Sequence, residues 1–258
     1  MSVKARKRFG QHFLTSSDAV EQIVSAVNPL PGETIVEIGP GRAAITAPLA
    51  EHEVTLHAIE LDRDLCKRLR DKFHDKRNVT IHEADALHFD FSTLGNNLRF
   101  VGNLPYNIST PLLFHLLTFD RITCDMHFML QKEVVDRMSA NPGGKNYGRL
   151  TVMLGARMQV LPLFDVPPTA FTPPPKVTSS VIRMRHLPAD TFDIRDPKML
   201  SKLVRLAFSH RRKTLRNAVK GLVSDADFAA AGLEAGARPE QIPVAGWVSL
   251  ANQLAGAK

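Results

Sequence analysis

Short apolar runs alternate with amphipathic segments through most of the chain, and this alternation restricts the fold more than any other feature of the sequence. Runs typical of strands occupy residues 33–39, 53–62, 78–85, 98–103, 124–131, 148–164 and 176–186. Apolar residues recur at helical spacing in the segments 18–27, 43–52, 63–73 and 109–119. Strands that alternate with helices form a mostly parallel sheet with helices on both faces. The sequence therefore predicts an α/β fold for this part of the chain.

The character of the sequence changes after His186. Residues 187–196 resemble a linker, and the patterns that follow are helical without a clear strand, at 197–223, 225–235 and 237–255. A chain of 258 residues is long enough for one large and one small domain. We therefore expect a sheet-containing domain over residues 1–187 and a small all-helical C-terminal domain over residues 188–258.

Positive charge gathers in two places, and the net charge of the chain is +7. The first cluster lies near the N-terminus and comprises Lys4, Arg6, Lys7 and Arg8. The second is uninterrupted by acidic residues and comprises Lys198, Lys202, Arg205, Arg211, Arg212, Lys213, Arg216 and Lys220. Two such clusters favour a surface that binds nucleic-acid phosphates. The alternative is a pair of solvated helix faces.

The sequence also argues against several classes of protein. The two cysteines, Cys66 and Cys124, are far apart and form no CxxC motif, so we expect neither a disulfide framework nor a zinc cluster. The ten histidines are scattered and indicate no metal site. No apolar run reaches membrane-spanning length, and the basic N-terminus lacks the apolar core of a secretory signal. We expect a cytoplasmic protein and, without a heptad pattern or an apolar patch, a monomer.

A glycine-rich turn and two acids follow successive predicted strands. Gly39 and Gly41 end the first strand, Glu60 ends the second, and Asp85 follows the third. The spacing at the turn could pass for a dinucleotide fingerprint, but Pro40 removes a backbone N–H that a pyrophosphate would need. Ligands of α/β sheets bind at the carboxyl ends of the strands, where carboxylates accept hydrogen bonds from ribose hydroxyls and an adenine amine. A nucleoside ligand without phosphate fits this set, and S-adenosylmethionine is such a ligand.

The next predicted strand ends in Asn103-Leu104-Pro105-Tyr106. One reaction open to S-adenosylmethionine is transfer of its methyl group to the N6 amine of an adenine. This amine is a poor nucleophile because its lone pair is delocalised into the ring, so hydrogen-bond acceptors must draw that pair out of the ring plane. The side-chain oxygen of Asn103 and the carbonyl of Leu104 could do this, with Pro105 restricting the residue before it and Tyr106 offering a face for stacking. Asn-x-Pro also occurs as a simple turn.

Several motifs together resemble the rRNA adenine dimethyltransferases. They are RKRFGQHFL, VEIGPG, NLPYNIST and FTPPPKVTSSV, with Glu60 and Asp85 between them. AFSHRRKTLRNAVKGL and ARPEQI resemble the C-terminal helical domain of the type that acts on the small ribosomal subunit. The resemblance spans residues 6–254. It implies a Rossmann-like class I methyltransferase sheet, with an S-adenosylmethionine-binding catalytic domain at 1–187 and a small helical rRNA-binding domain at 188–258.

The resemblance also implies roles for individual residues. It implies a cofactor-binding set of His12, Leu14, Gly39, Gly41, Glu60, Asp85, Ala86 and Asn103. It implies a catalytic motif of Asn103, Leu104, Pro105 and Tyr106, with Phe171 packing on the target base opposite Tyr106; core packing is the other interpretation of Phe171. The rRNA-binding set is Lys4, Arg6, Lys7, Arg8, Arg211, Arg212, Lys213 and Arg216, the last four expected on a basic helix.

The implied substrate is a pair of adjacent adenosines in a hairpin loop near the 3′ end of 16S rRNA in the small ribosomal subunit, each methylated twice at N6. The chain departs from the family pattern at Ala43, where glycine is usual, and at His12, where asparagine is common. A methyl group at residue 43 is expected to weaken or displace cofactor binding. In the second transfer the N6 amine carries one N–H and one methyl group. The site is therefore expected to tolerate a methyl group near one of its two hydrogen-bond acceptors.

Other functions remain open from the sequence. The same fold could serve a ribosome-assembly or nucleic-acid-binding factor without catalysis, and a large-subunit rRNA adenine methyltransferase would share the first domain. A DNA adenine methyltransferase would carry a second proline in place of Leu104. An NAD oxidoreductase would need a hydride-handling residue, which the sequence does not offer.

Overall fold

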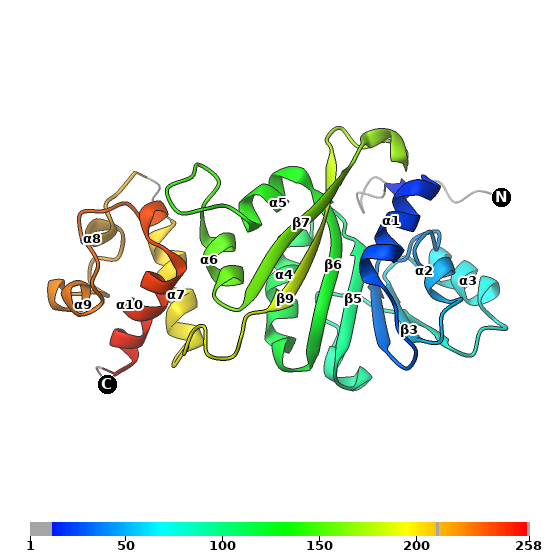
Figure 1. Ribbon diagram of the computed structural model, residues 1–258, viewed down its shortest axis with the longest axis horizontal. Coiled ribbons are helices and arrows are strands. Elements are labelled where there is room, and N and C mark those ends of the chain that lie inside the picture. The colour runs from blue at the N-terminus through cyan, green and yellow to red at the C-terminus, as the bar shows by residue number, and fades with distance from the viewer. Residues whose placement is uncertain (1–11, 210–211, 257–258) are drawn as a thin grey trace. The chain divides into compact units, whose positions relative to one another are not determined.

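The computed structural model describes residues 12–209 and 212–256 (Figure 1). The chain divides into two compact units. One contains residues up to 135 together with 161–185, and the other contains 136–160 together with 186 onward. Residues 136–160, which the sequence-based division assigned to the first domain, therefore group with the C-terminal helices. Within the described ranges, no helix is long and apolar enough to cross a membrane.

The first unit is built on a sheet of seven strands in the order β4-β3-β2-β5-β6-β9-β7. Its strands are β2 (Thr34–Ile38), β3 (Thr55–Glu60), β4 (Val79–Glu83), β5 (Leu98–Asn103), β6 (Thr123–Gln131), β7 (Met158–Val166) and β9 (Ser179–His186). A two-stranded sheet joins β1 (Phe13–Leu14) to β8 (Phe171–Thr172). The helices along the sheet are α1 (Ser17–Val27), α2 (Thr46–Leu49), α3 (Arg63–Lys72), α4 (Ser109–Leu116) and α5 (Lys132–Met138).

The pairings confirm the predicted α/β class. Strands β4, β3, β2, β5 and β6 are parallel to one another, and β9 pairs with β6 in the antiparallel direction. One expectation is wrong: residues 148–164 are not a single strand, because α6 (Arg149–Gly155) precedes β7. The apolar run of α6 is buried on almost every side, and a short apolar run cannot by itself distinguish a buried helix from a buried strand.

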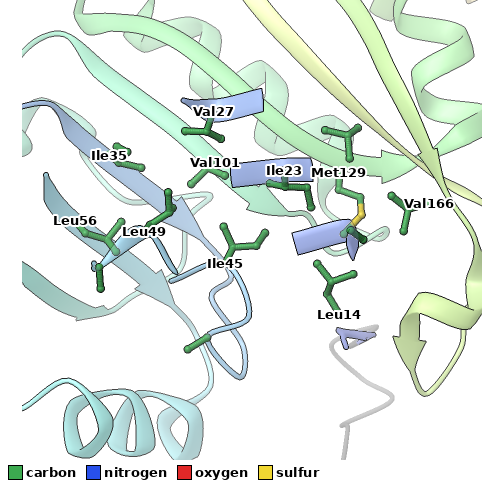
Figure 2. Close-up of a cluster of buried hydrophobic side chains, with 14 of the residues drawn as sticks. Leu14, Ile23, Val27, Ile35, Ile45, Leu49, Leu56, Val101, Met129 and Val166 are labelled. Carbon is green, nitrogen blue, oxygen red and sulfur yellow. The ribbon is translucent and has the colours of Figure 1, made fainter. Parts of the chain in front are cut away.

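A buried apolar cluster covers one face of the sheet (Figure 2). Ile23 and Val27 of α1 pack there with Ile35 of β2 and Val101 of β5, and Met129 of β6 extends the cluster. Neighbouring strand residues point to the opposite face, where Phe100 meets the ring of Phe91 edge-on at 5.1 Å. Burial on both faces explains why these strands read as nearly continuous apolar runs.

A buried ion pair lies between the central strands. Arg99 of β5 is directly opposite Asp125 of β6, and its guanidinium donates to both carboxylate oxygens, at 2.9 and 3.0 Å. The same guanidinium donates to Glu33 at 2.6 Å and to the carbonyl of Val27 at 2.7 Å. Arg99 is 8% exposed and Asp125 is 3% exposed. The pair is therefore satisfied by several hydrogen bonds, as a buried charge requires.

The second unit is helical, as predicted for the C-terminal part. Its helices are α6, α7 (Pro197–Ala207), α8 (Leu215–Ala218), α9 (Asp225–Ala230) and α10 (Val244–Gly256). Helix α7 buries Leu200, Leu203, Val204 and Ala207 and packs against α6 and α10. Asp196 caps its first turn by accepting from two backbone N–H groups. The basic residues of α7 lie on its exposed face.

Candidate functional site

The predicted cofactor-binding residues gather around one pocket at the carboxyl ends of β2, β3 and β5. The pocket is lined by all of them: His12, Leu14, Gly39, Gly41, Glu60, Asp85, Ala86 and Asn103. Leu104, Pro105 and Tyr106 line the same pocket. Parallel strands end at a common edge, so residues scattered over some ninety positions of sequence meet there.

The turn after β2 depends on left-handed backbone conformations. Gly39 and Gly41 have φ of 70° and 57°, which side chains rarely tolerate. At Gly41 a Cβ would also lie 3.2 Å from the ring of Phe13. Ala43 continues the pattern with φ of 66°, although it is not glycine. Ala43 is buried in the apolar cluster and does not line the pocket, so its methyl group does not narrow the space for a ligand.

Glu60 is held by backbone amides at the end of β3. One carboxylate oxygen accepts from Leu61 and Asp62, both at 2.9 Å, and the other accepts from Gly41 at 3.2 Å. Burial raises the pKa of Glu60, and the amide hydrogen bonds oppose the rise. The oxygen that faces Gly41 accepts a single hydrogen bond from the described residues, which leaves it a lone pair for a further donor.

Asp85 closes another side of the pocket, in the turn after β4. Its Oδ1 accepts from the backbone N–H of Leu87 at 2.9 Å, and its Oδ2 lies 3.2 Å from Nδ1 of His88. The side chain is 37% exposed. The backbone hydrogen bond orients the carboxylate and leaves acceptor capacity for a ligand amine.

The segment Asn103–Tyr106 is fixed to its neighbours at several points. The side-chain amide of Asn103 donates to the carbonyl of His12 at 3.0 Å, so its Oδ1 is left for another donor. The N–H of Leu104 donates to the carbonyl of Met129 in β6 at 3.1 Å. The Tyr106 hydroxyl lies 3.0 Å from that of Ser179, and its ring stacks on the imidazole of His12 with centroids 5.5 Å apart.

Strand β5 approaches β2 closely just before this segment. A Cβ on Gly102 would collide with the carbonyl oxygen of Ile38. The absence of a side chain at residue 102 therefore allows the ends of the two strands to lie together, and with them the glycine turn and Asn103. Glycine is required here by space, since its φ is ordinary.

Phe171 does not line the pocket, although its strand partner Leu14 does. It is 3% exposed, pairs with Leu14 between β8 and β1, and belongs to the apolar cluster. Its burial agrees with the core-packing interpretation of this residue. The role opposite Tyr106 stays a prediction, and it would require Phe171 to leave the cluster.

Sequence reasoning missed residues that line the pocket. Glu37 of β2 is 1% exposed, and its Oε2 has no hydrogen-bond partner among the described residues. Burial raises its pKa to about 7. The signal was available, since Glu37 is a charged residue between the apolar residues Val36 and Ile38 of the strand. Leu61, half-exposed, follows Glu60 directly, Leu87 lies two residues after Asp85, and both also line the pocket.

The predicted rRNA-binding residues are only partly covered by the structure. Lys4, Arg6, Lys7, Arg8 and Arg211 lie outside the described residues. Arg212 and Lys213 are exposed in a turn between α7 and α8, so the expected basic helix around them is wrong. Arg216 is exposed on the short helix α8, where it pairs with Asp225 at 3.0 Å. Across the described ranges, no group of three or more potential metal ligands occurs.

Solved structures share this fold. The dimethyladenosine transferase from Plasmodium falciparum superposes with a TM-score of 0.77 at 23% identity, covering 93% of this chain and 96% of that one. The 23S rRNA methyltransferase ErmE superposes with a TM-score of 0.74 at 23% identity, covering 94% of this chain and 99% of that one. At this identity the likeness concerns the fold alone.

Sequence relatives are closer and span nearly the full chain. The ribosomal RNA small subunit methyltransferase A of Aromatoleum aromaticum is 54% identical over 252 residues, 98% of this chain and 95% of the relative. The protein of the same name from Dechloromonas aromatica is 52% identical over 250 residues, 97% of this chain and 98% of the relative. The sequence profile described as ribosomal RNA adenine dimethylase matches residues 2–256. This chain therefore belongs to the ribosomal RNA adenine dimethylase family.

Proposed function

We propose that this protein transfers methyl groups from S-adenosylmethionine to N6 of two adjacent adenosines near the 3′ end of 16S rRNA in the small ribosomal subunit, twice on each base. The observation that carries the proposal is the pocket where the glycine turn, Glu60, Asp85 and Asn103 converge. The full-length similarity to proteins named ribosomal RNA small subunit methyltransferase A supports the choice of substrate.

In this proposal the pocket at the carboxyl edge of the sheet would hold S-adenosylmethionine, which would supply an electrophilic methyl group. Glu60 accepts from the ribose hydroxyls, and Asp85 accepts from the adenine amine. Gly39 and Gly41 let the backbone approach the ligand, while Leu14 and Ala86 add apolar contact. The main chain of His12 and the amide of Asn103 join this cofactor set through their hydrogen bond to each other.

The target adenine would enter beside Asn103. The free Oδ1 of Asn103 and the carbonyl of Leu104 accept from the N6 amine and turn its lone pair toward the methyl carbon. Pro105 keeps the Leu104 carbonyl extended, and Tyr106 contributes stacking area. No covalent intermediate is needed, because the amine nitrogen attacks the methyl carbon and the sulfonium sulfur leaves as a neutral thioether. The proton lost from nitrogen passes to solvent.

The exposed basic residues of the helical unit are proposed to hold rRNA phosphates. Arg212, Lys213 and Arg216 belong to the expected set, and Lys202 and Arg205 of α7 add to it. A protein that neutralises fewer phosphates releases fewer counterions, so its binding depends less on salt concentration. Replacing Arg212 and Lys213 with alanine should therefore weaken binding to small subunits and flatten its salt dependence, without changing cofactor affinity.

Methyl transfer to isolated ribosomal subunits tests the proposal. Small subunits that lack the modification, large subunits and adenine-containing duplex DNA are incubated with labelled S-adenosylmethionine, and the nucleosides are identified by mass spectrometry. We expect dimethyladenosine in the small subunit alone. Label in the large subunit would show that large-subunit rRNA is the substrate instead. Ribosome binding without any label would favour an assembly factor without catalysis.

Variants assign the roles within the pocket. Asn103→Ala should abolish dimethylation while leaving most cofactor affinity, and Glu60→Gln should weaken cofactor binding by about tenfold, as for a lost hydrogen bond to a charged group. Glu83 pairs with Glu60 in the register of β3 and β4 but lies outside the pocket, so Glu83→Gln is the matched control. Wild-type dimethylation by Asn103→Ala would refute its role.

A further inference from the structure

The hydroxyl of Tyr106 is held by a residue far away in the sequence. Ser179 begins β9, and its hydroxyl oxygen lies 3.0 Å from that of Tyr106. Ser179 is fully buried, and it is opposite Gln131 in the register of β6 and β9. Its backbone is therefore part of the rigid sheet, whereas Tyr106 lies in the loop that follows β5.

We propose that Ser179 is a positioning residue that sets the orientation of the Tyr106 ring, and that the second methyl transfer to each adenine depends on it most. The proposal rests on the proposed function, because it assigns Tyr106 to the target base. Ser179 touches neither cofactor nor base in this scheme and acts through the tyrosine.

The Tyr106 side chain contacts both Ser179 and His12. The backbone of Tyr106 follows Leu104, whose N–H is fixed to Met129 of β6, but rotation about the side-chain bonds is not restricted by that contact. One face of the ring meets the imidazole of His12, with an interplanar angle of 29°. His12 belongs to the segment before β1, outside the seven-stranded sheet. The hydrogen bond to Ser179 thus ties the ring to the main sheet.

The two methyl transfers place different demands on this ring. In the first, the N6 amine has two N–H groups, and two acceptors at Asn103 and Leu104 hold it. In the second, one N–H has been replaced by a methyl group, so a single hydrogen bond remains. Stacking on Tyr106 must then supply more of the orientation that brings nitrogen to the methyl carbon. Rotation of the Tyr106 ring should therefore slow the second methyl transfer more than the first.

Four variants test this. Ser179→Ala and Tyr106→Phe each remove one partner of the hydrogen bond, and the double variant removes both. Ser180→Ala is the matched control, because Ser180 is the next residue of β9, equally buried, and its hydroxyl donates to the carbonyl of Phe164 instead. Small subunits lacking the modification are the substrate, and mass spectrometry follows monomethyl- and dimethyladenosine over time.

We expect Ser179→Ala to slow the second transfer by about fivefold, the rate factor for a hydrogen bond worth about 1 kcal/mol, and the first transfer by less. Monomethyladenosine should accumulate, and the affinity for S-adenosylmethionine should not change. Tyr106→Phe should behave alike, and the double variant should be no slower than either single variant. Ser180→Ala should give the wild-type product ratio. If the effect of Ser179→Ala came from a general loss of stability, the product ratio of Ser180→Ala would change as well.

Three results would overturn the proposal: a wild-type product ratio for Ser179→Ala, the same monomethyl accumulation for Ser180→Ala, or additive losses in the double variant. If Ser179→Ala does not fold, Tyr106→Phe alone must show the accumulation. A second readout separates this proposal from the function itself. The chain has two tyrosines, so NMR of protein carrying ¹³C-labelled tyrosine resolves Tyr106 by comparison with Tyr106→Phe. An unchanged Tyr106 signal in Ser179→Ala refutes positioning, whereas failure of the wild type to methylate any subunit refutes the function.

Discussion

At alkaline pH, the Glu37→Gln variant should be more stable toward unfolding than the wild type. Burial raises the pKa of this carboxyl from its ordinary value of 4.5 to about 7, and the nearby charge of Glu60 adds to the rise. The folded protein therefore binds a proton more tightly than the unfolded chain does. The stabilisation from the proton on Glu37 is complete below pH 4.5, and it is lost as the pH rises to about 7. At about 1.4 kcal/mol for each pKa unit, the loss amounts to about 3 kcal/mol.

Urea denaturation of the wild type and Glu37→Gln, at pH 5 and at pH 8, measures this effect. The difference in unfolding free energy between the two proteins isolates residue 37 from all other titrating groups. It should change by about 2 to 3 kcal/mol between the two pH values, in favour of the glutamine variant at pH 8. Glu83→Gln, which removes an exposed acid from β4, controls for the loss of a negative charge. A difference that is the same at both pH values would refute the reasoning.

Three further substitutions test packing and charge pairing within the sheet-containing unit. Ala43→Gly relieves a left-handed conformation but loses a buried methyl group, so stability should change by at most about 1 kcal/mol and cofactor affinity by at most about twofold, as titration calorimetry would measure. Gly102→Ala should destabilise by about 3 kcal/mol or more through collision with the backbone of β2, whereas Gly148→Ala, with open space around it, should not; thermal unfolding compares them. Arg99→Met should cost about 3 to 5 kcal/mol in urea denaturation, because it leaves Asp125 buried without its partner.

The sequence alone was sufficient for the α/β class and for the expectation that most of the predicted cofactor-binding residues line one pocket. Strand ends can be read from the residues, and the edge at which parallel strands end is shared, so Gly39, Glu60, Asp85 and Asn103 could be brought together without coordinates. Family motifs then placed His12 and Leu14 at the same pocket. These predictions succeeded because each depends on local periodicity and on one rule of sheet topology.

Side-chain direction at individual positions could not be predicted in this way. The methyl group of Ala43 was expected to approach the cofactor, yet Ala43 is buried in the apolar cluster and does not line the pocket. Phe171 begins a motif that suggested a place opposite Tyr106, and in the structure it is buried in the apolar cluster, where it pairs with Leu14. A motif gives the residue type at a position, whereas packing decides which way that residue faces.

Contacts between distant segments also required the tertiary structure. The apolar run in α6 is compatible with a strand until its packing against α7 and α10 is known. Ser179 meets Tyr106 across 73 positions of sequence, because β9 joins the sheet beside β6 and brings its first residue level with the loop after β5. Local pattern therefore determined which elements form and which residues end them, and the order of strands in the sheet decided which side chains meet.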